Sequence, residues 1–544
     1  MTGSRWHRWH LAGSTTGGLW RWDRAASILA LGAVLTASWV PPARAQAQFV
    51  PPTGSAAAPA DGLLIHTPRA ARSSTAQASV HVLGRTAAGS RVRVAGEAVT
   101  VQRTGVFARD EVPLSLGVNT VLIEATGPGG QTLTQTLEIE RVEPPSPGAA
   151  PAAEPEAVEA IAPGLYVAGD DGVALTHGVH LVRLGGPYLA ELPAGTRLVV
   201  NGRTATHYRV TLAPDTTAWA PIASLAPAPA NATRPWAAFT SLSVEGNERG
   251  DTVTIPLPPG LPWAVRAVTT PTGGAQLELD LYGAHLASTW ITHRASARLV
   301  REVGVEQPAD GRLRLRISLH GRTLWGWHVE RSNGALRLSV QAPPRLHARR
   351  PLRGLRIALE AGHGGPTNLG AVGATGVPEK DVNRWTVQAL KSELESAGAL
   401  VTSVREGDDN PTLAERAERV ADSGAQLFIS VHANATDTAR GVLRVQGTST
   451  YYRHAHQRDL AAAIQQRMLA LTGLADFGVV GAFNYLPLRR ITEVPAVLVE
   501  QAFMTHPAEE AQMLDPAFRA RTARAVRMGL EDFVRAALTP APRR

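Results

Sequence analysis

LFISVHAN, at residues 427–434, is a short apolar run that closes on a histidine and an asparagine. A run of this length and character is consistent with a buried strand. Similar runs occur at RIALE (356–360) and AVLVE (496–500), and segments with helical spacing lie between them. This alternation predicts an α/β domain at residues 352–540, with a mostly parallel, twisted sheet flanked by helices.

The same pattern predicts individual elements of this domain. In the first helix, apolar residues recur at three- to five-residue intervals from Val382 to Leu394, which gives the helix one buried face. The predicted strands are Arg356–Glu360, Leu400–Val404, Leu427–Val431, Val442–Val445 and Ala496–Glu500. The predicted helices are Glu379–Ala397, Leu413–Asp422, His454–Leu471 and Pro516–Ala536.

Four side chains with metal or acid–base chemistry fall at the ends of these elements. His363 follows the first strand in a glycine-rich loop, and Glu379 opens the first helix. His432 ends the third strand, and Glu500 ends a late one. Ligands of open α/β sheets bind beyond the carboxyl ends of the strands. We therefore expect His363, His432 and Glu500 on one rim, within reach of Glu379.

Two imidazoles and one carboxylate form the ligand set expected for catalytic zinc, with a fourth position left for water. Zinc polarises a carbonyl and lowers the pKa of its water to about 7. A second carboxylate is then needed to take the water's proton and pass it to the leaving amine. Glu500 fits that role, and His363, Glu379 and His432 fit the ligand set.

Taken singly, each of these residues has a plainer explanation. A histidine in a glycine loop can serve as a hydrogen-bonded turn residue, and a histidine after a strand can be a satisfied edge residue. A glutamate at a helix start is a favourable charge. A carboxylate at the end of an apolar strand, in contrast, requires a partner or a function. We expect other histidines of the domain to serve packing or lie on the surface, namely His454, His456 and His506.

The length of 544 residues suggests three or four domains, and the composition excludes several classes of protein. The 51 glycines and 39 prolines, without a fixed period, exclude a coiled coil or collagen-like protein. Cysteine is absent, so any metal must be held by His, Asp or Glu. The net charge of +8 suits any anionic polymer, but the arginines are not clustered with aromatics, and nucleic-acid binding is not expected.

The first 45 residues resemble an export signal. A basic leader precedes the apolar run Ala25–Val40, and Ala43-Arg44-Ala45 supplies the small-x-small pattern of a cleavage site. The run is about 16 residues, shorter than the roughly 20 of a spanning helix, although an uncleaved anchor or a buried helix remains an alternative. We expect an exported protein, periplasmic or associated with the cell envelope, with no stable membrane span after cleavage.

The front half alternates apolar and polar residues between frequent glycines, which is typical of all-β modules. The first module resembles the immunoglobulin-like modules of bacterial envelope enzymes, the second a bacterial SH3-like barrel, and the third the AMIN domain that localises cell-wall amidases. The predicted divisions are a loose segment at 46–61, a β-sandwich at 62–143, a linker at 144–160, an SH3-like module at 161–225 and an AMIN-like module at 236–343.

Residues 355–536 resemble the zinc-dependent N-acetylmuramoyl-L-alanine amidases of the Amidase 3 family. The segments that carry the resemblance are IALEAGHGG (357–365), GVPEKDVN (376–383), LFISVHAN (427–434) and PAVLVE (495–500). The resemblance implies zinc ligands at His363, Glu379 and His432 and a catalytic Glu500. It also implies peptidoglycan as the substrate, cleaved between N-acetylmuramic acid and the L-alanine of the stem peptide during wall remodelling and daughter-cell separation.

Two features depart from that family. Its members usually carry Asp where this chain has Glu360, at a position that orients the histidine ligand. We expect altered but not lost activity. Some division amidases also carry a blocking helix between the second histidine ligand and the catalytic glutamate. Residues 435–499 hold about two strands and one helix, so we expect a site that is not self-occluded.

Two other functions compete with this one. Zinc carboxypeptidases also use two His and one Glu, but their first two ligands lie three residues apart, whereas His363 and Glu379 lie sixteen apart. A catalytically inactive, amidase-like cell-wall binding or scaffold protein is the non-enzymatic alternative, and metal analysis separates it from the enzyme. In either case the N-terminal modules offer a surface for an envelope or division-site partner.

Overall fold

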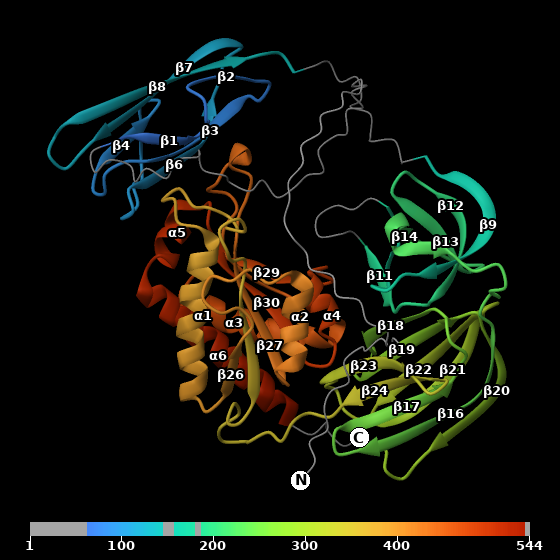
Figure 1. Ribbon diagram of the computed structural model, residues 1–544. Helices are drawn as coiled ribbons and strands as arrows, with labels where there is room; N and C mark the ends of the chain where they lie inside the picture. The colour runs from blue at the N-terminus through green and yellow to red at the C-terminus, as the bar shows by residue number, and fades with distance from the viewer. Residues whose placement is uncertain (1–61, 145–156, 180–186, 272, 539–544) are drawn as a thin grey trace, which may run out of the picture. The chain divides into compact units, whose positions relative to one another are not determined.

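The computed structural model describes residues 62–144, 157–179, 187–271 and 273–538 (Figure 1). It contains an all-β N-terminal region and a C-terminal domain in which helices flank a mixed sheet. The predicted export signal at 1–45 and loose segment at 46–61 lie outside the described residues. None of the helices within those ranges combines the length and apolar character that crossing a membrane requires.

The first β region contains two sheets, in the orders β1-β3-β6 and β2-β8-β7-β4-β5. Buried residues of both sheets, Val82 and Phe107 from one and Ile123 and Ile139 from the other, form its core. Its strands are β1 Leu64–Thr67, β2 Arg72–Thr75, β3 Ser79–Arg85, β4 Arg91–Val94, β5 Glu97–Val99, β6 Val106–Pro113, β7 Gly117–Thr126 and β8 Thr132–Arg141. Its assignment as immunoglobulin-like stays a prediction.

The second β region is one seven-stranded sheet in the order β11-β10-β14-β13-β12-β9-β15. The last two residues of the predicted linker, Glu159 and Ala160, belong to its first strand. Its elements are β9 Glu159–Ala168, β10 Val173–Thr176, β11 Tyr188–Leu192, β12 Arg197–Arg203, β13 His207–Ala213, β14 Thr216–Pro221, the 3-10 turn η1 Ile222–Ser224 and β15 Leu225–Pro227.

The third β region has two sheets, in the orders β20-β16-β17-β24-β23 and β18-β19-β22-β21. The SH3-like and AMIN-like assignments of the second and third regions stay predictions. The strands are β16 Ala237–Asn247, β17 Gly250–Pro256, β18 Trp263–Thr269, β19 Ala275–Tyr282, β20 Ala284–His293, β21 Val300–Ala309, β22 Arg312–Leu319, β23 Gly326–Ser332 and β24 Ala335–Gln341.

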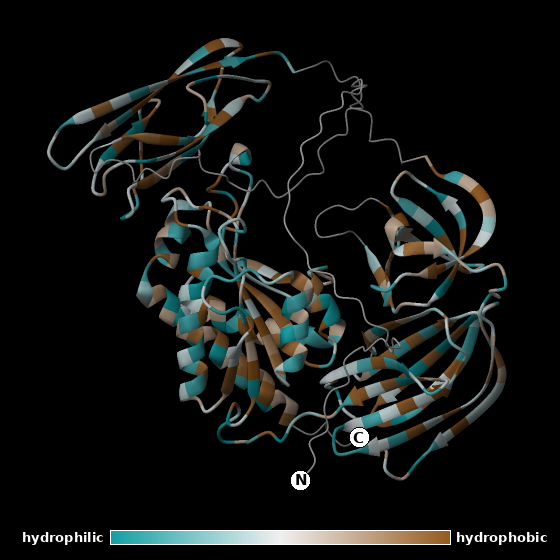
Figure 2. Cartoon of the chain, viewed as in Figure 1, coloured by the Kyte–Doolittle hydropathy of each residue, from teal (hydrophilic) through white to brown (hydrophobic). Residues whose placement is uncertain are grey.

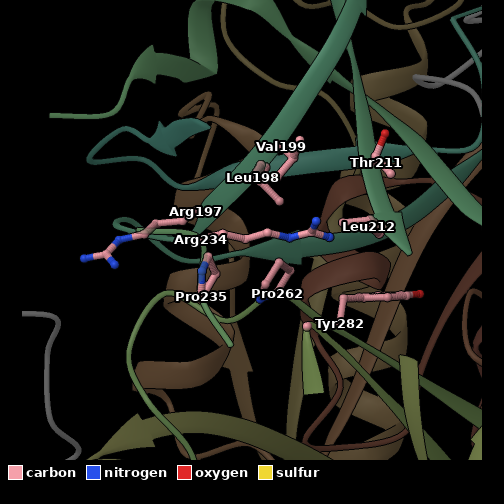
Figure 3. Close-up of a pocket in the computed structure, with 10 residues that line it drawn as sticks. Arg197, Leu198, Val199, Thr211, Leu212, Arg234, Pro235, Pro262 and Tyr282 are labelled. Atoms are coloured by element: carbon pink, nitrogen blue, oxygen red, sulfur yellow. The ribbon is translucent and has the colours of Figure 1, made fainter. Parts of the chain in front are cut away.

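A small hollow is lined by residues of the second and third β regions (Figure 3). Arg197 and Thr211 line it from β12 and β13, Tyr282 lines it from the end of β19, and Arg234 lies in the segment before β16. None of the four candidate site residues lies in its wall. The hollow therefore belongs to the β regions and not to the predicted active site.

The C-terminal domain has one six-stranded sheet in the order β26-β25-β27-β30-β28-β29. The strands are β25 Arg356–Ala361, β26 Leu400–Ser403, β27 Leu427–Asn434, β28 Thr448–Tyr451, β29 Asp476–Val480 and β30 Ala496–Phe503. The helices are α1 Glu379–Ser396, α2 Leu413–Asp422, α3 Arg458–Thr472, α4 Leu486–Arg490, α5 Pro507–Met513 and α6 Pro516–Leu538, and the 3-10 turns are η2 Thr438–Arg440 and η3 Ala455–Gln457.

The sheet was predicted to be mostly parallel, and the structure shows a mixed sheet. β26, β25, β27 and β30 pair in parallel, and β28 runs antiparallel to β30. The strand predicted at Val442–Val445 is wrong, since the strand that pairs with β30 is β28, at Thr448–Tyr451. Of the predicted segment, Val442 is buried but Leu443 is 38% exposed, and Gly441 and Gly447 turn the chain on either side with positive φ.

Helices cover both faces of this sheet (Figure 1). On one face α1, α3 and α6 pack against strand residues such as Ile357 and Ile429. On the other face α2 and α4 pack against the alternate residues, including Ala358 and Phe428. The central strands are hydrophobic along much of their length (Figure 2), as expected for strands buried on both sides. The layered core fixes the strand ends from which the candidate site is built.

Candidate functional site

His363 lies just beyond the carboxyl end of β25, in the turn that leaves the sheet. Its backbone has φ of 64°, a left-handed conformation that is uncommon for residues other than glycine. Its Nδ1 lies 2.8 Å from Oδ1 of Asn368. A hydrogen bond at Nδ1 leaves Nε2 as the ring atom that faces a ligand.

Glu379 is the first residue of α1, after the N-cap Pro378, and is only 4% exposed. The partial positive charge of the helix N-terminus favours a carboxylate there. Its Oε2 accepts a hydrogen bond from the backbone N–H of Ala371 at 2.9 Å, and its Oε1 accepts one from Ala433 at 3.1 Å. These bonds orient a carboxylate that is almost completely buried.

His432 and Glu500 lie side by side on neighbouring strands. β27 and β30 are parallel, and their register places these two residues opposite each other. Glu500 is 7% exposed, and its charge acts on His363 strongly enough to contribute to a raised pKa of that imidazole. The rim predicted from the strand ends therefore brings all four candidate residues into one place.

Three of the four side chains converge closely. Ligand atoms of His363, Glu379 and His432 all lie within 4.8 Å of one another. The Oε2 of Glu379 is 3.0 Å from Nε2 of His363, and its Oε1 is 3.1 Å from Nδ1 of His432. The two imidazole rings meet edge to face, with centroids 5.0 Å apart. Glu500 lies beside this group and is not one of the three convergent residues.

Mutual electrostatics shift the acid–base behaviour of the group. Burial alone lowers the pKa of His363, but the charge and hydrogen bond of Glu379 outweigh it and raise the pKa to about 9. Burial raises the pKa of Glu379, whereas the two histidines lower it more, so its pKa lies well below the ordinary value. Glu379 is therefore a carboxylate at neutral pH, as a cation ligand must be.

The arrangement fits a small divalent cation. A Cβ on Gly362 would lie 2.2 Å from the ring of His432, and a Cβ on Gly370 would lie 2.5 Å from Oε2 of Glu379. Both positions must therefore be glycine for the three groups to converge. Within the described ranges, the buried Nε2 of His432 has no hydrogen-bond partner. Imidazole and carboxylate donors in this number suit zinc.

Sequence reasoning missed the residues that orient the ligands from behind. The Nδ2 of Asn383 donates to Oε1 of Glu379 at 3.1 Å, and Gln501 donates in turn to Asn383 at 3.0 Å. Thr386 completes the chain with a bond to Gln501 at 2.7 Å. Asn383 and Gln501 are fully buried, so each needs a partner. The available signal was the spacing from Glu379 to Asn383, which is one helical turn.

The other histidines of the domain are packed and not part of the site. Burial lowers the pKa of His454 to about 4 and that of His456 well below its ordinary value, so both rings are neutral. The side chain of His506 caps the start of α5 by accepting a hydrogen bond from the N–H of Glu509. These residues serve packing and capping, in agreement with their expected structural role.

Glu510 gives the C-terminal domain a pH-dependent stability. Burial raises its pKa to about 7 although its Oε1 accepts two hydrogen bonds from Thr375. The folded state thus holds a proton more tightly than the unfolded state, where the pKa is near 4.5. The free energy of unfolding therefore falls as pH rises from about 4.5 to about 7, by about 3 kcal/mol from this group.

We predict that Glu510→Gln removes this pH dependence, because glutamine keeps the acceptor oxygen and cannot ionise. The measurement is urea unfolding of the full chain at pH 5 and pH 8. The variant is expected to be more stable than the wild type at pH 8 and similar to it at pH 5. Glu395→Gln, an exposed position on α1, serves as the control. An equal loss of stability with pH in Glu510→Gln and the wild type would refute the prediction.

The C-terminal domain is similar to known proteins. Residues 357–532 match the family model described as N-acetylmuramoyl-L-alanine amidase, which confirms the resemblance predicted for this part of the chain. The protein named N-acetylmuramoyl-L-alanine amidase LytC of Bacillus subtilis is 32% identical over 189 residues, which cover 34% of this chain and 36% of that protein. The similarity thus spans little more than a third of that relative.

A second relative and a solved structure are also similar to this chain. The protein named probable cell wall amidase LytH of Staphylococcus aureus is 31% identical over 210 residues, covering 38% of this chain and 65% of that protein. Among solved structures, the catalytic domain of CwlV, an N-acetylmuramoyl-L-alanine amidase of Bacillus (Paenibacillus) polymyxa, is 29% identical, with a TM-score of 0.31. That match covers 33% of this chain and 97% of that structure.

Proposed function

We propose that this chain is a zinc-dependent peptidoglycan hydrolase that cleaves the amide between N-acetylmuramic acid and the L-alanine of the stem peptide. The observation that carries the proposal is the convergence of His363, Glu379 and His432 within 4.8 Å, next to Glu500, in the domain that matches the amidase family. His363, Glu379 and His432 are the proposed zinc ligands, and Glu500 is the proposed general base.

Zinc at such a site polarises the scissile carbonyl and lowers the pKa of water to about 7. The residues of the chain do the rest. Glu379 supplies the negative charge and, with the two imidazoles, fixes the position of the cation. Glu500 takes a proton from the attacking water and gives it to the alanine nitrogen as the carbon–nitrogen bond breaks. The products are a free lactyl carboxylate and a stem peptide with a free amino terminus.

The location and partners follow from the same proposal. Peptidoglycan lies outside the cytoplasm, which agrees with the export signal predicted at residues 1–45. We propose that the three N-terminal β regions hold the catalytic domain at the envelope, through the wall or a division-site partner, and that the activity serves wall remodelling and daughter-cell separation. Nucleic acid has no part in this function.

An inactive wall-binding or scaffold protein remains the second candidate, because the β regions make up more than half of the described residues. The two candidates differ in metal content and in turnover. A scaffold binds peptidoglycan without a cation and releases nothing, whereas the hydrolase needs the cation for every turnover.

The experiment is digestion of purified peptidoglycan by the full chain, with the soluble products identified by mass spectrometry. We expect release of intact stem peptides, about one zinc per chain, loss of release after chelation and its return when zinc is added. We also expect release without an added activator, since α3 is the one long helix that the structure describes between β27 and β30. Wall binding without peptide release by zinc-loaded protein would favour the scaffold.

A further inference from the structure

A buried ion pair lies next to the candidate metal site, in contact with the backbone of His363. Arg416 on α2 is 1% exposed, Glu360 on β25 is 0% exposed, and Nη1 of the arginine is 2.7 Å from Oε1 of the glutamate. Taking both charges out of water is costly, and replacing such a pair by apolar residues is often neutral or stabilising. A gain in stability is therefore a weak explanation for the presence of this ion pair. Its other contacts indicate a role at the metal site.

The remaining donors of Arg416 hold backbone oxygens. Its Nη2 donates to the carbonyl of His363 at 2.8 Å, and its Nε donates to the carbonyl of Pro411 at 3.0 Å. The planar guanidinium presents these donors in fixed directions. His363 has the left-handed φ of 64°. Arg416 thus holds a peptide in a sparsely populated conformation, at the residue whose ring reaches the metal site.

Glu360 connects Arg416 to the surroundings of His432. Its Oε1 also accepts a hydrogen bond from the hydroxyl of Tyr485 at 2.8 Å. The ring of Tyr485 packs edge-on against the ring of His432, with centroids 5.8 Å apart. Burial and the charge of Glu360 raise the pKa of Tyr485 well above its ordinary value, so the hydroxyl remains a donor. One carboxylate oxygen therefore supports the surroundings of both imidazoles.

We propose that Arg416 is a positioning residue of the metal site, and that Glu360 and Tyr485 fix its orientation. The inference rests on the proposed function, because it concerns the site where zinc is expected. Arg416 touches no reacting atom and acts through the backbone of His363. Oε1 of Glu360 lies 2.7 Å from Arg416 and 2.8 Å from the hydroxyl of Tyr485, which are ordinary hydrogen-bond lengths. The side chain of aspartate is about 1.5 Å shorter, so an aspartate at position 360 would not reach these two donors. This explains why the chain needs the longer acid at position 360.

Two variants test the inference. Arg416→Lys keeps the charge, so Glu360 remains paired, but its one nitrogen lacks the planar fork with which arginine reaches Glu360, His363 and Pro411 from three separate nitrogens. The double variant Glu360→Gln with Arg416→Met removes both charges together and leaves no unpaired buried ion. Arg419→Met is the matched control, because Arg419 lies on the same helix and its hydrogen bonds go to Val404 and Asp409 rather than to Glu360 or His363.

The measurements are zinc affinity of the full chain by chelator competition, the absorption spectrum of the Co²⁺-loaded chain, and kcat and KM on peptidoglycan fragments. We expect both test variants to bind zinc about 10–100-fold more weakly, with an altered Co²⁺ spectrum and a lower kcat at similar KM. Circular dichroism and urea unfolding of the metal-free chain report folding separately. The Arg419→Met control is expected to match the wild type.

The outcomes separate the inference from the function on which it rests. If the wild type binds no zinc, the proposed function fails. If the wild type binds zinc and both folded variants bind it equally well with an unchanged Co²⁺ spectrum, the function stands and the positioning role fails. Weaker zinc binding in a variant that is folded, with the control unaffected, supports the role of Arg416.

Discussion

Replacing Glu500 with glutamine is expected to leave zinc binding intact while peptide release falls about 10²–10⁴-fold. The reason is the position of Glu500 on β30, opposite His432 but outside the three residues whose ligand atoms converge. Glutamine has nearly the same shape as glutamate and cannot take a proton. The measurement is kcat on peptidoglycan fragments together with the zinc content of the purified chain.

Glu418→Gln is the matched control for this substitution. Glu418 is exposed on α2, and the same chemical change there is expected to leave kcat unaltered. Wild-type turnover in Glu500→Gln would show that another group moves the proton. Loss of zinc along with activity would show instead that Glu500 belongs to the ligand set.

The substitution His363→Ala is expected to abolish zinc binding and hydrolysis together. It removes one of the three proposed ligands and leaves only Glu379 and His432. Zinc affinity is therefore expected to fall by more than the 10–100-fold typical when a residue that only orients a ligand is replaced. Zinc that binds only the folded state stabilises it, by about 2.7 kcal/mol at a hundredfold excess over Kd. We therefore expect zinc to raise the urea midpoint of the wild type but not that of His363→Ala.

An exposed histidine provides the control here. His347→Ala, in the segment that precedes β25, is expected to keep both the zinc content and the zinc-dependent midpoint. If His363→Ala retained stoichiometric zinc with an affinity like that of the wild type, His363 would not be a ligand. If it lost activity but kept zinc, its role would lie with the substrate rather than the cation.

The sequence predicted the central strands well, because burial on both faces makes them apolar. β25, β27 and β30 lie where runs of Ile, Leu, Val and Phe predicted them. β28 was not predicted, since Thr448, Ser449 and Thr450 are fully buried although their side chains are polar. Their burial depends on the neighbouring β30 and on the helices of the domain, which no local pattern encodes.

The direct site residues were predictable for the same topological reason. His363, His432 and Glu500 follow or end apolar strands. Neighbouring parallel strands bring their carboxyl ends together regardless of the lengths and sequences of the loops. The orienting residues were not, because Asn383 and Gln501 have no local pattern that separates them from surface amides. Arg416 had a signal that was not used: it lies on the face of α2 that also carries Ala417 and Val420, where a charge must have a partner.

The close fit of Gly362 and Gly370 around the ligands has a consequence for judging relatives of this chain. One added methyl group at either place would fill the volume that an imidazole or a carboxylate occupies now. A homologue could therefore keep every ligand and the proton-transfer residue, and still have lost the ability to bind its cation. Whether such a homologue binds its cation therefore depends also on Gly362 and Gly370, which have no side chain to bind a cation or transfer a proton.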